Sequence, residues 1–189
     1  PDEEMLSAFA GISRGGFYQR LTADSKERVE RIVPMIMQQS LEVKAPSETL
    51  LRCLALVRSV AGRSGYLQVL GDQPAALAHL VKLFSESRWL ANFVLRQPMV
   101  IDELLIGPGA VLYPDSGAVR TNVLEQLERL RDAGLEVQMD SLRHYRQSRE
   151  MRLACAWLDG TLTLMQVSDQ LSWLAEALIE VVLELVKAP

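Results

Sequence analysis

The sequence predicts an all-α fold, an irregular multi-helix bundle of short helices followed by three long helices, with no β-sheet. Three observations predict it. Apolar residues recur three or four positions apart through nearly every segment, and no segment alternates apolar and polar residues as a half-buried strand would. The hydrophobic content of 49% over 189 residues allows a core that needs neither disulfides nor metal. Short breaks containing Gly, Pro, Ser or Asp separate the apolar segments.

The first expected helix follows Asp24, which has the spacing of a capping box with Glu27. Its apolar face is formed by Val29, Ile32, Val33, Ile36 and Met37. Pro34 lies inside this pattern and should kink or split the helix, because proline lacks an amide hydrogen. We expect a second helix over residues 48–61, with Ser47 as its N-cap.

Shorter helices are expected next. Residues 66–70 should form a short turn of helix, and Asp72-Gln73-Pro74 has proline near a first helical position. Ser87 begins another helix, and Gln97-Pro98 restarts the chain into residues 99–105. Connections of two or three residues predict neighbours that are antiparallel or cross steeply.

The clearest loop is residues 107–117, which contain two groups of glycine and proline. Longer helices are expected after it, over residues 118–132, 136–158 and 166–187. We therefore predict a short-helix subdomain at 1–106, the loop as a junction, and a long-helix subdomain at 118–189, together forming one compact unit. No repeat of fixed period indicates a regular solenoid.

Composition narrows the possible partners and compartment. The net charge of −4 argues against a general nucleic-acid binder. The last apolar run contains Glu176, Glu180 and Glu184, so we expect it not to span a membrane. Cys53 and Cys155 lie in apolar helical patterns and favour buried thiols over a disulfide, which predicts a reducing, cytoplasmic setting. The chain begins without methionine or a visible secretory signal, and we expect it to be a piece of a longer protein.

Motifs for nucleotide or metal chemistry are missing from the sequence. Residues 14–17 (Arg-Gly-Gly-Phe) are too short to cradle phosphates and are typical of a turn. The two histidines, His79 and His144, lack a glutamate three positions earlier. Asp140 and His144 share a helix face, a spacing more typical of a surface hydrogen bond than of half a metal site. We predict no catalytic, cofactor-binding or metal residue in this chain.

Two features point to contacts between parts of the protein. The first is a polar seam of Arg146, Arg149 and Glu150, because Arg146 falls on the apolar stripe of its helix. A pair at i, i+4 contributes only about 0.2–0.5 kcal/mol, so a further carboxylate is expected near Arg146, with Asp102 and Glu103 as candidates. In the alternative reading, Arg146 extends along its methylene stem to water.

The second feature is the last helix. Its core stripe is Val167, Leu171, Leu174, Leu178, Val182 and Leu185. Ile179, Leu183 and Val186 form a second apolar strip, and Trp173 is expected to project from the far side; we predict that these four residues form a domain interface. Its three glutamates have no basic partner along the helix until Lys187. The alternative is a helix buried on two sides within the chain, with a solvated acidic edge.

Several segments resemble the bifunctional glutamine synthetase adenylyltransferase/adenylyl-removing enzyme family. They are residues 64–83, 89–105, 142–147 and 168–177, and the last, which contains Ser168-Asp169-Gln170-Leu171, is the most specific. The chain departs from the family pattern where Gln97 and Gln170 stand in place of an expected histidine, and where Cys155-Ala156-Trp157 is bulkier than usual.

The resemblance implies a parent enzyme of nitrogen regulation with two nucleotidyltransferase domains. One domain transfers AMP from ATP to a tyrosine of glutamine synthetase, the other removes it by phosphorolysis, and both use paired aspartates with a divalent metal such as Mg²⁺. Here Gln170 and Leu171 follow Asp169 without a second acidic residue, so the chain is expected to be the non-catalytic central region. Implied partners are the neighbouring nucleotidyltransferase domains, the PII signal protein and glutamine synthetase, with no nucleic acid and no membrane. The alternatives are a stand-alone helical protein-interaction adaptor and a small helical enzyme.

Overall fold

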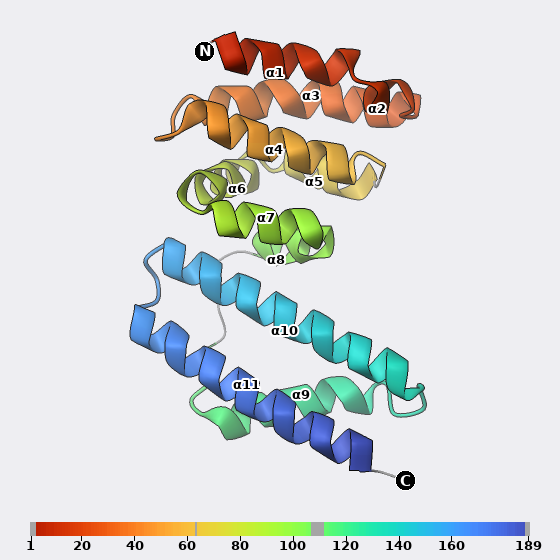
Figure 1. Ribbon diagram of the computed structural model, residues 1–189, viewed down its shortest axis with the longest axis vertical. Helices are drawn as coiled ribbons and strands as arrows, with labels where there is room; N and C mark the ends of the chain where they lie inside the picture. The colour runs from red at the N-terminus through yellow and green to blue at the C-terminus, as the bar shows by residue number, and fades with distance from the viewer. Residues whose placement is uncertain (1–2, 63, 107–111, 188–189) are drawn as a thin grey trace. The chain divides into compact units, whose positions relative to one another are not determined.

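The computed structural model describes residues 3–62, 64–106 and 112–187, and in this part of the chain every regular element is a helix (Figure 1). The predicted all-α class is therefore confirmed. The chain divides into two compact units, Pro1–Gly107 and Pro108–Pro189, which are called unit 1 and unit 2 below. In the described residues, no helix is both long enough and apolar enough to cross a membrane.

Unit 1 contains short and medium helices. They are α1 (Glu3–Arg14), α2 (Gly16–Gln19), α3 (Ala23–Ser40), α4 (Pro46–Val60), α5 (Ser64–Asp72), α6 (Pro74–Glu86), α7 (Arg88–Arg96), a 3₁₀ turn η1 (Pro98–Val100) and α8 (Ile101–Ile106). Helix α4 is central, because it contacts α1, α3, α5, α6 and α7. Its buried side chains include Leu50, Cys53 and Val57, so the core of unit 1 is built around one helix.

Two arginines of unit 1 bind carbonyl groups at helix ends. Arg52 donates from Nη1 to the carbonyl oxygen of Phe84 at 2.7 Å, in the last turn of α6. Arg31 donates from Nη2 to the carbonyl oxygen of Gly71 at 3.1 Å, in the last turn of α5. The last carbonyls of a helix have no hydrogen-bond donor within the helix and carry partial negative charge. A guanidinium supplies both a donor and a positive charge.

Two predicted helix starts in unit 1 are confirmed. The side chain of Ser87 accepts a hydrogen bond from the amide of Leu90 at 3.1 Å and caps α7. Pro74 occupies a first position of α6, where its missing amide hydrogen costs nothing.

Two other predicted starts are wrong, and so is the split that was one of two possibilities at Pro34. Helix α3 is capped by Thr22, whose hydroxyl accepts from the amide of Ser25 at 3.3 Å, and Asp24 lies in the first turn. Helix α4 begins at Pro46, before the predicted cap Ser47. Pro34 does not split α3, which runs through it; Pro34 is exposed, so the carbonyl that loses its donor can be hydrated.

Unit 2 is a three-helix arrangement of α9 (Ser116–Glu128), α10 (Leu135–Leu158) and α11 (Leu164–Lys187). All three pairs of these helices are in contact. The core is formed by Val119, Val123, Leu127, Leu142, Leu174, Ala177 and Val181. Helices α10 and α11 have 24 residues each, but α9 has only 13, so the expected three long helices are two.

Side-chain caps set the helix ends in unit 2. After α9, the side-chain Nε2 of Gln138 donates to the backbone carbonyls of Leu130 and Ala133 at 3.1 and 3.2 Å. These bonds favour a turn, and α9 ends before Asp132, where the sequence predicted its end. Helix α10 ends in a Schellman motif at Gly160, whose φ of 71° favours glycine.

The start of α11 is a reciprocal cap that the sequence reading missed. The Thr163 hydroxyl accepts from the amide of Gln166, and the Gln166 side chain accepts from the amide of Thr163 at 2.9 Å. Because of this cap, α11 begins at Leu164, two residues before the predicted start.

Candidate functional site

A polar network joins the start of unit 2 to all three of its helices. It consists of Tyr113, Asn122, Tyr145, Arg149 and Gln170 and is called the Tyr113 network below. The side chain of Gln170, which is only 4% exposed, bonds both backbone groups of Tyr113. Its Oε1 accepts from the Tyr113 amide at 3.1 Å, and its Nε2 donates to the Tyr113 carbonyl at 2.7 Å. One side chain of α11 thus satisfies a non-helical residue that would otherwise lack partners.

The side chain of Tyr113 extends the network to α9 and α10. The guanidinium of Arg149 lies over its ring, with 4.5 Å from Cζ to the ring centroid, and Arg149 is 6% exposed. The hydroxyls of Tyr113 and Tyr145 are 3.5 Å apart, and Tyr145 donates to Oδ1 of Asn122 at 2.9 Å. Burial and then the hydrogen bond with Tyr113 raise the pKa of Tyr145, so its hydroxyl is neutral at physiological pH.

The predicted polar seam is divided by the structure. Arg146 pairs with Glu150 at 2.7 Å, with about half of the arginine side chain exposed, which agrees with the alternative in which Arg146 reaches water. Arg149, three residues later, is instead buried against Tyr113. Asp102 and Glu103 belong to unit 1, and their pairing with Arg146 stays a prediction. The buried part of the seam is therefore Arg149, which belongs to the Tyr113 network.

The predicted interface residues of α11 also fall into two groups. Ile179, Leu183 and Val186 are 62%, 51% and 65% exposed and lie on the outward side of the helix. Trp173 is half-buried and packs against the core of unit 2, so the expectation that it projects away from the core is wrong. The helical period alone did not reveal this packing.

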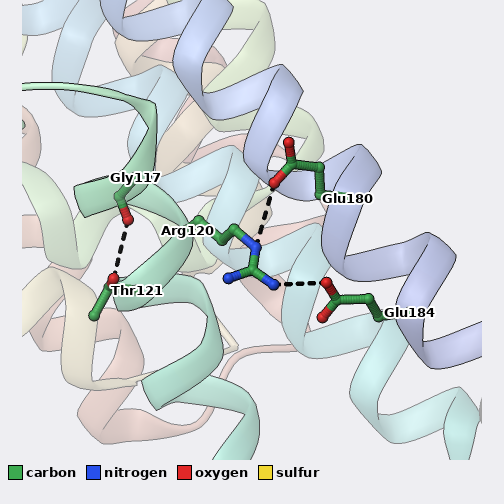
Figure 2. A network of polar contacts seen from close by, with 5 residues as sticks. All are labelled: Gly117, Arg120, Thr121, Glu180 and Glu184. Carbon is green, nitrogen blue, oxygen red and sulfur yellow. Dashed lines mark hydrogen bonds and ion pairs between the residues drawn. The ribbon is translucent and has the colours of Figure 1, made fainter.

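The acidic row of α11 has a basic partner that its own helix does not supply. Arg120 of α9 pairs through Nε with Glu180 at 3.3 Å and through Nη2 with Glu184 at 2.6 Å, as Figure 2 shows. The same view shows the Thr121 hydroxyl donating to the carbonyl of Gly117 at 3.0 Å in the first turn of α9. Within α11 the glutamates have no basic residue before Lys187, as the sequence indicated, and two of the three are paired by a residue of α9.

A cleft of about 410 Å³ opens near the end of α9. It is lined by Leu124, Leu127, Glu128, Arg131, Gln138, Val181, Glu184 and Leu185. Its charged groups already have partners, because Arg131 pairs with Glu128 at 3.3 Å and Glu184 with Arg120. The cleft is thus an apolar hollow with a neutralised rim.

The residues considered for metal or thiol chemistry are either bonded to other groups or buried. The Nδ1 atom of His144 lies 2.8 Å from the backbone carbonyl of Asp140, whose carboxylate pairs with Arg143. In the described residues, no three His, Cys, Asp or Glu side chains are grouped as metal ligands would be. Cys53 and Cys155 are buried and free, and burial raises the pKa of each thiol to about 12.

Comparison with known proteins gives a consistent result. The model of the family described as glutamate-ammonia ligase adenylyltransferase matches residues 77–188. Three relatives are bifunctional glutamine synthetase adenylyltransferase/adenylyl-removing enzymes. The one from Hahella chejuensis is 36% identical and aligns with 96% of this chain and 19% of its own length. Those from Thioalkalivibrio sulfidiphilus and Pseudomonas putida are 37% and 35% identical over 94% and 96% of this chain, and over 18% and 19% of their own lengths. The chain thus spans about a fifth of the length of these relatives.

Proposed function

The chain belongs to the glutamate-ammonia ligase adenylyltransferase family, and from this premise we propose that it is a non-catalytic central segment of such an enzyme. In this proposal the segment connects two nucleotidyltransferase domains and carries regulatory signals between them. The transfer of AMP to glutamine synthetase and its removal, with ATP and Mg²⁺, take place in those domains.

The environment of Gln170 carries the proposal. Adenylyl transfer of the kind expected in the family needs a second carboxylate shortly after the one at Asp169. Two positions after Asp169, where the second aspartate of a Ser-Asp-x-Asp signature would stand, the chain has Leu171, and the intervening Gln170 has a buried amide that is engaged on the backbone of Tyr113. A side chain with both amide atoms bonded inside the fold is unavailable to a metal or a nucleotide. The segment around Asp169 therefore supports a structural role.

The contacts between Tyr113 and the three helices of unit 2 support the connecting role. Tyr113 lies close to the start of the described part of unit 2, and Gln170, Tyr145 and Asn122 attach it to α11, α10 and α9. A displacement of the chain at Tyr113 would therefore act on all three helices at once. We propose that the exposed residues of α11, Ile179, Leu183 and Val186, contact a neighbouring nucleotidyltransferase domain, and that the PII signal protein or glutamine synthetase influences that contact.

An assay of AMP transfer tests the non-catalytic role. The purified chain is incubated with glutamine synthetase, radiolabelled ATP and Mg²⁺, and separately with adenylylated glutamine synthetase and phosphate. We expect no labelled AMP on glutamine synthetase and no release of ADP, while a complete relative such as that of Pseudomonas putida does both in parallel. Turnover by the chain alone, above that of a blank preparation, would refute the proposal.

A further inference from the structure

The outward side of α11 carries no charge along its whole length. Seven exposed residues make up this side, which is called the α11 outer face: Met165, Ser168, Ser172, Ala175, Ile179, Leu183 and Val186. They are spaced three or four residues apart, so they form one continuous stripe on the helix. The four large apolar members are more than half exposed, with Met165 at 71%. A continuous exposed stripe that contains no charged residue is typical of a contact surface.

Negative charge borders one edge of this stripe. Asp169 and Glu176 lie two turns apart beside it, both are exposed, and neither forms an ion pair with another residue in the described part of the chain. Glu180 and Glu184 continue the acidic row toward α9, but Arg120 neutralises them. The uncompensated charge is therefore confined to the half of the edge at Asp169 and Glu176.

The charge along this edge selects among possible occupants. An antiparallel second copy of α11 would bring acidic edge against acidic edge, which is unfavourable. A parallel copy would leave Asp169 and Glu176 without partners. A helix with an apolar stripe bordered by lysine or arginine would cover the face and pair both acids. Docking of an amphipathic helix by its apolar side is a common mode of recognition.

We infer that the α11 outer face binds an amphipathic helix whose apolar stripe has a basic edge, with Ile179, Leu183 and Val186 as the apolar contacts and Asp169 and Glu176 as the charge partners. The inference rests on the proposed function only in placing this helix in a neighbouring domain of the same enzyme. The chemistry of the face itself is independent of that assignment.

The test uses two synthetic helical peptides that share one leucine stripe. One peptide has lysines along the edge of the stripe, the other has glutamates at the same positions, and binding to the 189-residue chain is measured by fluorescence anisotropy. We expect the lysine peptide to bind about tenfold more tightly, because two surface ion pairs replace two repulsions. The difference should shrink at 1 M salt, where surface charges are screened.

Three double variants locate the binding. Ile179→Asp with Leu183→Asp should weaken the lysine peptide at least about tenfold, since it removes apolar contacts. Asp169→Lys with Glu176→Lys should abolish or reverse the preference between the peptides. Glu125→Lys with Glu136→Lys makes the same change in net charge at exposed acids of α9 and α10, which belong neither to the face nor to its acidic edge, and should leave the preference unchanged. Circular dichroism confirms that each variant keeps its helical content.

Each other outcome overturns the inference. Failure of both peptides to bind, or unchanged binding by the Ile179 and Leu183 variant, excludes the face as a docking site. Recognition by the acidic edge is excluded if the two peptides bind equally, or if the Glu125 and Glu136 variant changes the preference as much as the Asp169 and Glu176 variant does. Self-association that excludes the peptides identifies a second copy as the occupant. AMP transfer by the chain would refute the proposed function but would leave the peptide result unaffected.

Discussion

Units 1 and 2 differ in the contacts that hold their helices together. In unit 1 the central helix α4 is surrounded by five neighbours and buries apolar side chains such as Leu50 and Val57. In the described residues of unit 2, 112–187, three helices pack together, and polar side chains, above all Gln170 and Arg120, join their ends and edges. The difference indicates that an arrangement with few helices relies more on specific polar contacts. In unit 2 these contacts also fix the position of Tyr113, just before the first helix.

The largest expected effect is in the core of unit 1. Phe84 is fully buried in α6, so Phe84→Ala should lower the free energy of unfolding by about 3–5 kcal/mol through lost burial and a cavity. Urea denaturation measures the change. Leu41→Ala, at an exposed position, is the control and should change the stability by less than about 0.5 kcal/mol. A small effect at Phe84 would contradict the view that apolar packing around α4 holds unit 1.

The next effect concerns the amide that binds Tyr113. Gln170→Ala leaves the amide and carbonyl of Tyr113 without their partners and should cost about 2–3 kcal/mol. The matched control on the same helix is Ser172→Ala, which is exposed and should be neutral. Equal unfolding midpoints for the two variants would mean that the Tyr113 network does not stabilise unit 2.

The pH dependence of stability tests how completely the core of unit 1 excludes water. Burial raises the pKa of Cys53 to about 12, while a thiol in an unfolded chain has a pKa of about 8.5. As pH rises past about 8.5, the Cys53 thiol loses its proton in the unfolded chain but keeps it in the folded chain. The unfolded state is therefore stabilised relative to the native state. Between pH 8 and pH 10, the free energy of unfolding should fall by about 2 kcal/mol more in the parent than in Cys53→Ala. Parallel pH profiles of the two proteins would show that Cys53 is accessible to water.

The smallest effects are at the surface of unit 2. Arg120→Met removes two partly exposed ion pairs and should cost about 0.5–1 kcal/mol at low salt, and less at 1 M salt. Arg146→Met removes one exposed pair within α10 and should cost at most about 0.5 kcal/mol. If Arg146→Met is the more damaging of the two, the polar seam first predicted around Arg146 is more important for stability than the structure indicates.

The apolar period predicted most helices but not the details of their ends. Ser87 and Pro74 were read correctly because a cap and a first-position proline act within one turn of the helix. Thr22 was missed because the neighbouring Asp24 and Glu27 also have the spacing of a capping box. Helices α1 and α2 were not predicted, although the burial of Met5 and Ile12 shows that α1 contributes to the core.

The candidate site was harder to predict than the fold. Tyr113 and Gln170 are 57 residues apart, and no local pattern links a tyrosine beside a proline to an amide in a helix. The only signal was that Gln170 departs from a histidine expected by resemblance. Arg120 was missed for the same reason, since its partners lie on another helix. Helical spacing grouped Ile179, Leu183 and Val186 into one strip but left open whether the chain buries that strip, and the structure shows the three side chains exposed.

The attachment of Tyr113 by the side chain of Gln170 organises unit 2, and hydrogen exchange of the Tyr113 amide measures it. If Gln170 holds this backbone, the amide of Tyr113 should exchange as slowly as core amides of α11 such as that of Leu174, and Gln170→Ala should speed its exchange selectively. If the Tyr113 amide of the parent chain exchanges at the rate of an unprotected peptide, Gln170 does not hold this part of the backbone.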